Sequence, residues 1–262
     1  CAALGAGITS SDTGIISTGT AEVFSRIYPE APINREMFDG FFPCYEYHLD
    51  GYYFTFSLNH TGGLLLKWYC DEFCSDYRLY AAQLKENVFS YLDSKCPLGP
   101  TDLFFLPHLN GSGTPWCDTG SKGALIGIKL QTDRAAVYKA LMESLTYELA
   151  VNVELLELNH KAVNEITAVG GGASSDVWMQ LKADILGRPI RRIAIKEAGC
   201  LGAAMLAGKG VDVFSDYEYA SKICVNNAKI FYPSEKYGNI YREKLKVYKE
   251  LYPALVPFNR EL

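Results

Sequence analysis

Three consecutive glycines at positions 170–172 constrain the fold of this chain more than any other feature of its sequence. They follow an apolar run at residues 164–169 that is typical of a strand, and they precede a helical pattern at residues 176–186. That helix is expected to begin near Ser174 or Ser175, because serine is a good N-cap residue. A strand that turns tightly into a helix predicts an α/β domain with helices packed on a sheet.

The glycine-rich turn has two interpretations. Glycine permits positive φ and lets a ligand approach the main chain, and the N-terminus of the following helix attracts negative charge. The turn could therefore hold the phosphate or ribose of a nucleotide. The same glycines could instead serve only a tight, well-packed connection. The turn has neither the G-x-G-x-x-G spacing of a Rossmann fold nor the Gly-Lys-Ser/Thr of a Walker A loop, so the glycines alone leave both interpretations open.

The beginning of the chain is expected to be rich in β-structure. Residues 14–27 and 45–58 alternate apolar and polar side chains around turn-forming residues, as strands do. Within the second stretch, Leu49-Asp50-Gly51 predicts a hairpin. Gly62-Gly63 is expected to open a short helix that continues through LLLKWYCDEF.

Helices and strands alternate in the remainder. Apolar residues recur at steps of three and four between residues 133 and 159, which predicts a long helix with one apolar face. The other expected elements are short and bounded by Gly, Pro or polar turns. They are strands at 103–109 and 191–195, and helices at 76–98, 199–207 and 234–251.

Composition excludes several classes of protein. The formal net charge of −5 provides no basic field to hold nucleic acid or an anionic membrane. No run of 18 apolar residues predicts a membrane span, and the first residues lack the positive region of a signal peptide. A chain that opens on Cys1 without methionine is expected to be a fragment.

The eight cysteines are expected to be reduced. None forms a C-x-x-C motif, and the closest pair, Cys70 and Cys74, has helical spacing without further ligands. Scattered thiols in a chain of this size favour a cytoplasmic protein over a disulfide or metal framework. The four histidines, His48, His60, His108 and His160, are expected to be isolated from any nucleophile.

Several segments together resemble the C-terminal domain of the FGGY family of carbohydrate kinases. GGGASSDVWMQLKADILGRP resembles the family's adenosine-binding stretch, and KEAGCLGAAMLAGKG resembles a segment whose small residues lie close to that loop. LPHLNGSGTPWCDTGSKGALIGI resembles a third segment, in the expected order. CAALGAG and ISTGTAE resemble the start of the domain, with Ala21 where the family often has serine.

This resemblance implies the ribonuclease-H-like fold of actin-like ATPases, a mixed sheet flanked by helices with a β-rich N-terminal portion. Residues 1–100 would form that portion, with a Gly-Thr hairpin facing the phosphates and a helical insertion. Residues 101–262 would form the α/β core with the adenosine-binding loop. Asp118 and Asp184 match acidic positions of the family pattern and are expected to cap helices or form ion pairs.

The resemblance also implies a nucleotide site. In the family, a Gly-Thr pair faces the γ-phosphate, and a glycine at a helix N-terminus presents free N–H groups to an anion. A lysine one turn into that helix could point at the nucleotide, although such a lysine is often simply solvated. The corresponding nucleotide-binding residues here are Gly19, Thr20, Gly63, Lys67, Gly171, Gly172, Ala173 and Ser175.

The implied activity is transfer of the γ-phosphate of ATP, with Mg²⁺, to a hydroxyl of a sugar or polyol. The resemblance assigns sugar binding, most metal ligands and an aspartate base to an N-terminal domain upstream of Cys1, so no catalytic residue is expected in this chain. Alone it is expected to bind ATP or ADP weakly, to transfer no phosphate, and to expose surface that could support a homodimer. A non-catalytic regulator and a scaffold domain remain as alternatives.

Overall fold

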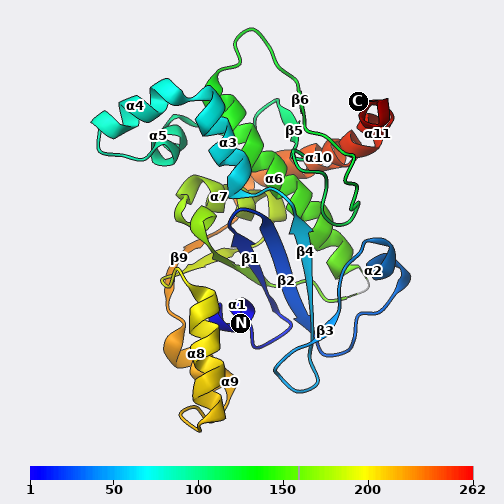
Figure 1. Ribbon diagram of the computed structural model, residues 1–262, viewed down its shortest axis with the longest axis vertical. Coiled ribbons are helices and arrows are strands. Elements are labelled where there is room, and N and C mark those ends of the chain that lie inside the picture. Colours follow the sequence, from blue (N-terminus) through cyan, green and yellow to red (C-terminus); the bar gives the residue numbers. More distant parts are fainter. Residues whose placement is uncertain (159, 262) are drawn as a thin grey trace.

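A seven-stranded mixed sheet forms the centre of the molecule (Figure 1). The computed structural model describes residues 1–158 and 160–261. The strand order is β3-β4-β2-β1-β7-β8-β9. The strands are β1 (Thr13–Thr18), β2 (Glu22–Tyr28), β3 (Tyr45–Glu46), β4 (Tyr53–Asn59), β7 (Glu165–Val169), β8 (Ile190–Ile193) and β9 (Asn227–Phe231).

The sheet joins the two ends of the chain. β1, β2, β4 and β3 pair antiparallel in that spatial order, and the hairpin predicted at Leu49-Asp50-Gly51 is confirmed as the β3–β4 pair. β1 then pairs in parallel with β7, with Thr13 opposite Glu165, and β7 pairs in parallel with β8. β9 closes the far edge antiparallel to β8. Strands from the β-rich portion and from the α/β core therefore share one sheet.

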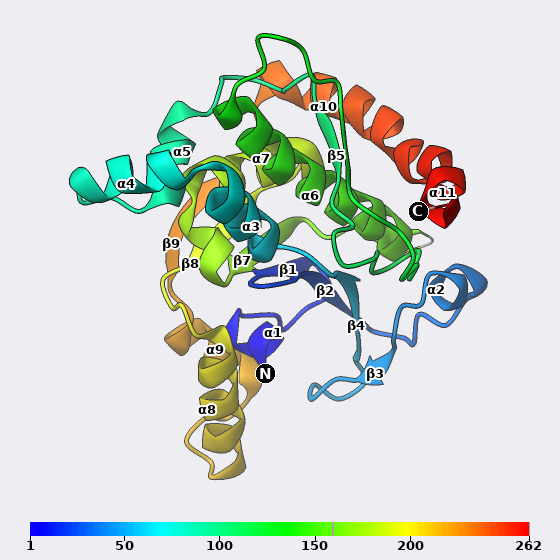
Figure 2. The same cartoon turned by 45° about the horizontal axis from the view of Figure 1, so that its top comes forward.

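Helices cover both faces of the sheet (Figure 2). Successive residues of a strand point to opposite faces, so Ile16 joins the larger core under α6 (Arg134–Glu157), whereas Ile15 joins a smaller core near α1 (Ala2–Gly5). The larger core also contains residues of α3 (Gly63–Phe73), α7 (Asp176–Leu186) and α10 (Glu235–Lys249). The opposite side carries α8 (Ala198–Gly210) and α9 (Tyr217–Cys224).

The small residues of α8 serve its contact with α1. A Cβ placed on Gly202 would lie 1.8 Å from the Cys1 carbonyl oxygen, and one on Gly5 would lie 1.8 Å from the Ala198 carbonyl oxygen. These distances leave no room for any side chain. The segment that the family resemblance placed close to the glycine loop thus packs directly on the first helix.

The long helix is more deeply buried than its sequence pattern predicts. α6 ends at Glu157, and the expected last residue, Asn159, lies outside the described residues. Its apolar stripe is buried as expected, but Lys139, Glu143 and Glu148 on its other faces are buried too. The single apolar face is therefore corrected: α6 contacts the sheet on one side and α3, α7 and α10 on the others.

Polar side chains inside this core bind one another. Tyr241 of α10 donates a hydrogen bond to Glu143 at 2.9 Å, and Tyr248 donates to Glu148 at 2.7 Å. Glu148 also contacts His108 Nε2 at 3.2 Å, and His108 Nδ1 lies 2.7 Å from the Ser121 hydroxyl. These bonds satisfy groups that would be costly to bury alone.

His108 therefore does pair with a serine, contrary to the expectation from sequence. His108, Ser121 and Glu148 are each only 3% exposed. Asn259 Nδ2 in α11 (Leu251–Glu261) also donates to the Ser121 hydroxyl at 3.3 Å. Because no substrate can reach a buried hydroxyl of this kind, the group holds the 107–123 loop against α6 and the C-terminal helices.

Two other expectations are corrected. The single helix expected at 76–98 is two helices, α4 (Ser75–Gln83) and α5 (Val88–Lys95). The chain breaks at Lys85, whose φ is 58°, and Asn87 caps the second helix by accepting from the Ser90 amide at 2.8 Å.

The strand expected at 103–109 is short and lies outside the main sheet. Among the described residues, β5 (Phe104–Leu106) pairs only with β6 (Ala124–Ile126), which no pattern predicted. The sequence also did not predict α1, α2 (Arg35–Asp39), α9, α11 and β9.

All eight cysteines are free. Within residues 1–158 and 160–261, no helix is both long enough and apolar enough to cross a membrane.

Replacing Tyr241 by Phe is expected to destabilise the protein by about 1–3 kcal/mol, because Glu143 loses a buried hydrogen-bond donor. Urea unfolding measures this change. Tyr232→Phe is the matched control, since the Tyr232 side chain is 65% exposed. This variant should change the free energy of unfolding by no more than about 0.5 kcal/mol. Equal stabilities for the two variants would contradict a stabilising role for the α6–α10 hydrogen bond.

Candidate functional site

One cavity of about 390 Å³ gathers residues from five separate parts of the chain. Its walls come from the β1–β2 hairpin, the start of α3, helix α5, Tyr138 of α6 and the turn from β7 into α7. All but one of the residues predicted to bind nucleotide line it, and these are Gly19, Thr20, Gly63, Lys67, Gly171, Gly172 and Ser175. Ala173 is the exception, because its side chain is buried and both of its backbone groups are engaged: its amide donates to the Gly170 carbonyl at 3.1 Å and its carbonyl accepts from Arg192 at 3.1 Å.

The β1–β2 hairpin is bound directly to the start of α3. The Gly63 amide donates to the Gly19 carbonyl at 2.8 Å, and the Gly62 amide donates to the Thr20 carbonyl at 2.8 Å. Gly63 begins α3 as predicted, but its N–H is not free for an anion, so that expectation is corrected. A Cβ on Gly63 would lie 2.9 Å from the Gly19 carbonyl oxygen, which explains the need for glycine.

The three glycines after β7 have different roles. Gly170 has a φ of 87°, and a Cβ there would lie 2.5 Å from the Thr18 carbonyl oxygen. A Cβ on Gly172 would lie 2.5 Å from Thr18 Cγ2 and 2.9 Å from the Trp178 ring. Gly171 has no atom within 4 Å of its Cβ position. Two glycines therefore serve tight packing, and the third borders open space.

Ser175 begins α7 as its N-cap. Its hydroxyl oxygen accepts from the Trp178 amide at 3.0 Å, which satisfies one of the free donors of the helix N-terminus. The same hydroxyl donates to Asp93 Oδ2 in α5 at 2.7 Å. Burial raises the pKa of Asp93, whereas hydrogen bonds with Ser175 and Tyr138 oppose that change.

Lys67 lies at the cavity edge with its charge partly engaged. Its side chain is 64% exposed, and its ammonium group binds Asp71 four residues further along α3. Asp71 also binds Arg78. The surrounding water screens this cluster.

A buried ion pair lies directly behind the cavity. Lys182 of α7 binds Glu22 at the start of β2, and both side chains are fully buried. The Thr18 hydroxyl donates to Glu22 at 2.8 Å and accepts from Lys182 at 3.2 Å. The Lys182 ammonium also lies 4.4 Å from the centre of the Trp178 ring. Burial lowers the pKa of Lys182, whereas the neighbouring carboxylate of Glu22 opposes that change.

Sequence reasoning missed much of the cavity wall. The missed residues come from α3, α5 and α6 or lie next to predicted ones, and they are Thr18, Leu64, Leu66, Asn87, Phe89, Ser90, Asp93, Tyr138, Ser174 and Trp178. Ser174 and Trp178 stood within the recognised glycine–helix motif. Nothing in the sequence of α5 distinguishes Asp93 from a solvated acid on a surface helix.

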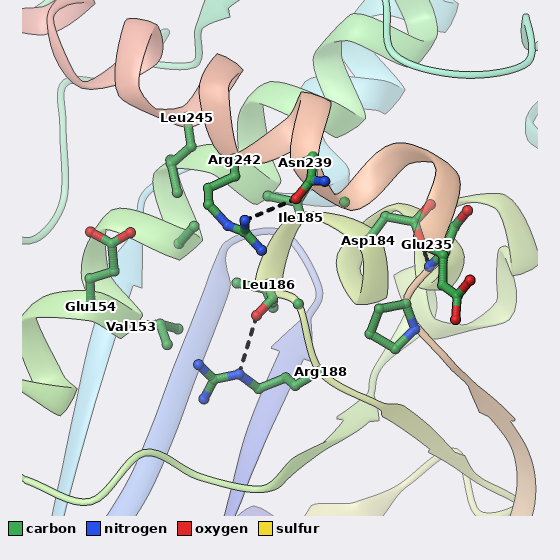
Figure 3. A pocket seen from close by; sticks show the side chains of 15 residues that line it. Val153, Glu154, Asp184, Ile185, Leu186, Arg188, Glu235, Asn239, Arg242 and Leu245 are labelled. Carbon is green, nitrogen blue, oxygen red and sulfur yellow. Dashed lines mark hydrogen bonds between the residues drawn. The ribbon is translucent and has the colours of Figure 1, made fainter.

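A second, larger cavity of about 520 Å³ lies between α6, α7 and α10 (Figure 3). Two guanidinium groups line it, but each already has a partner. Arg242 donates to Asn239 at 3.0 Å, and Arg188 donates to the Leu186 carbonyl at 3.3 Å. Asp184 accepts from the Ser234 amide at 2.7 Å, which holds the start of α10 against α7. None of the predicted site residues lines this cavity, so the smaller cavity is the candidate site.

Asp118, the other acid of the family pattern, binds groups of its own loop and of α11. It accepts from the Gly120 amide at 2.9 Å and from the Tyr252 hydroxyl at 2.9 Å. Hydrogen bonds from Tyr252 and the loop lower its pKa.

Comparison with known proteins places this geometry in context. The family model "FGGY family of carbohydrate kinases, C-terminal domain" matches residues 14–211. The xylulose kinase of Bacillus subtilis (strain 168) is 29% identical over 262 residues, which is 100% of this chain and 50% of that protein. The chain thus spans about half the length of the curated relatives that it matches along its whole length.

Two solved structures are similar to this one. The ligand-bound xylulose kinase from Lactobacillus acidophilus superposes with a TM-score of 0.83 at 23% identity, covering 97% of this chain and 49% of that one. The xylulose kinase from Rhodospirillum rubrum gives a TM-score of 0.83 at 24% identity, covering 99% and 50%. These superpositions confirm the actin-like fold, a mixed sheet flanked by helices.

Replacing Lys182 by Met is expected to destabilise the protein by about 3–5 kcal/mol, because Glu22 would remain buried without its charge partner. The double variant Lys182→Met/Glu22→Gln is expected to recover a large part of that loss, since no buried charge is left unpaired. Urea unfolding of the single and double variants measures both effects. Additive losses in the double variant would contradict a direct interaction between the two side chains.

Proposed function

Because this chain belongs to the FGGY family of carbohydrate kinases, we propose that it is the ATP-binding half of an enzyme that phosphorylates a sugar or polyol. The γ-phosphate of ATP would pass to a hydroxyl group of the acceptor. The observation that carries the proposal is the meeting of the Gly19–Thr20 turn, the start of α3 and the Gly171–Ser175 segment around one cavity of about 390 Å³. Xylulose is the acceptor to test first, because the xylulose kinase of Bacillus subtilis matches this chain along its whole length.

The groups that line the cavity suit a nucleotide. The β1–β2 hairpin and α3 supply the exposed Thr20 hydroxyl, the cationic Lys67 and the bare turn at Gly19, where a Cβ would meet nothing within 4 Å. Helix α5 and the start of α7 supply Ser175 and aromatic side chains. We therefore assign the phosphates to the first set of residues and the adenosine to the second. Phosphoryl transfer depends mainly on positioning and charge stabilisation, and a turn fastened to α3 supplies positioning.

Mg²⁺ would enter with ATP. Within the described residues, no three His, Cys, Asp or Glu side chains are grouped to hold a metal. Magnesium is commonly held by one or two carboxylates together with substrate phosphates. We propose that those carboxylates and the aspartate base belong to the sugar-binding half of the whole protein, while this chain holds the nucleotide. The free thiols support our proposal that the enzyme acts in the cytoplasm.

Gly171→Val is expected to weaken ADP binding by about tenfold or more, because the new side chain extends into open space at the cavity wall. Its free energy of unfolding should stay within about 1 kcal/mol of that of the unaltered protein. Gly172→Ala is the contrasting variant. It should lower stability by about 1–3 kcal/mol, since its Cβ would collide with Thr18 and Trp178. Calorimetric titration with ADP and thermal unfolding measure the two effects. Unchanged ADP affinity in Gly171→Val would remove the glycine turn from the binding site.

The whole protein that carries these residues is expected to release ADP from ATP only when a suitable sugar is present. The 262-residue chain alone should bind ADP weakly and release none, because acceptor positioning and the base would come from the other half. A coupled ADP-release assay with pentoses, pentuloses, hexoses and polyols tests both proteins. Sugar-dependent turnover by the 262-residue chain would show that the division of labour is wrong.

A further inference from the structure

The Ser175 hydroxyl is held in a defined orientation at the cavity wall. A hydroxyl has one proton to donate and two lone pairs that can accept. The proton of Ser175 is donated to Asp93 Oδ2 at 2.7 Å, and one lone pair accepts from the Trp178 amide at 3.0 Å. Ser175 is half-buried and lines the cavity. The group that it can offer to a ligand is therefore its remaining lone pair, which only accepts.

Asp93 also determines which part of a nucleotide can lie beside Ser175. It is the acidic residue among those that line the cavity in the described part of the chain. A carboxylate repels phosphate groups, so the phosphates are directed away from Asp93 and toward Thr20 and Lys67. Near Asp93 the walls include the aromatic side chains of Phe89, Tyr138 and Trp178. Flat aromatic walls beside a few polar groups suit a purine ring better than a sugar or a phosphate.

We propose that Asp93 is a positioning residue that keeps the Ser175 hydroxyl as an acceptor and so makes the site select a purine with a 6-amino group over one with a 6-oxo group. This inference rests on the proposed nucleotide site. The amino group of adenine donates hydrogen bonds and matches the free lone pair of Ser175. The 6-oxo group of hypoxanthine or guanine also accepts, so its lone pairs would face that of Ser175 without a proton between them.

The test compares ADP with IDP, in which a 6-oxo group replaces the 6-amino group and N1 carries a proton. Calorimetric titration of the whole protein measures both dissociation constants, and the readout is their ratio. The unaltered protein is expected to prefer ADP by about tenfold or more, as one matched against one mismatched hydrogen bond implies. If Asp93 had a purely structural role, replacing it would weaken the binding of ADP and IDP together and leave the ratio of their dissociation constants unchanged.

Two variants should abolish the preference. Asp93→Ala frees the hydroxyl to turn and donate, so the ADP-to-IDP ratio should fall to near one. Ser175→Gly removes the hydroxyl, and glycine is tolerated at an N-cap at a cost of only a few tenths of a kcal/mol. The double variant should show no further loss of discrimination, because both changes remove the same interaction. The control is Asp176→Asn, which removes a neighbouring carboxylate that pairs with Arg192 and Lys229 outside the cavity.

The outcomes separate the inference from the proposed function. Failure of the unaltered protein to bind either nucleotide would overturn the nucleotide site itself. Equal affinity of the unaltered protein for ADP and IDP, or an unchanged ratio in Asp93→Ala, would overturn the role of Asp93 while leaving the nucleotide site in place. Loss of discrimination in both variants, with the Asp176→Asn ratio unchanged, is the result that supports it.

Discussion

The buried contact between Lys182 and Glu22 is the interaction on which the geometry of the cavity depends. It joins α7, which follows the glycine turn, to the hairpin that carries Gly19 and Thr20. Two charges in a low-dielectric core must stay in contact, because separating them leaves each one desolvated and unpaired. The Thr18 hydroxyl and the Trp178 ring complete their surroundings. The two walls of the cavity therefore keep a defined spacing.

Buried polar groups that need particular partners also determine the packing in the rest of the core. α6 is buried on nearly all sides, yet it carries Glu143 and Glu148, and each accepts a hydrogen bond from a tyrosine of α10. An apolar core can pack in several ways, whereas buried carboxylates need particular donors at particular positions. These bonds specify where α10 lies on α6. They also hold the 107–123 loop through His108 and Ser121.

Only some features of the cavity could be predicted from the local sequence. Strand β7, the glycine turn and the Ser175 cap were predictable because each depends on neighbours within a few residues. The gathering of Gly19, Gly63 and Gly171 at one cavity was expected only from family resemblance. Asp93 was not predictable by either route, because its contact with Ser175 spans 82 residues and requires α5 to dock beside α7.

By itself, the sequence determined the α/β class, the strand–glycine–helix unit and the β3–β4 hairpin, since backbone freedom, capping and alternation act over short distances. Tertiary structure alone decided the rest. It bound the Gly63 amide to the Gly19 carbonyl, and it packed Gly172 against Thr18 while leaving Gly171 open. It also placed α8 against α1. Such contacts join segments far apart in the chain, so the choice between a packed and an open glycine appears only after the elements have docked.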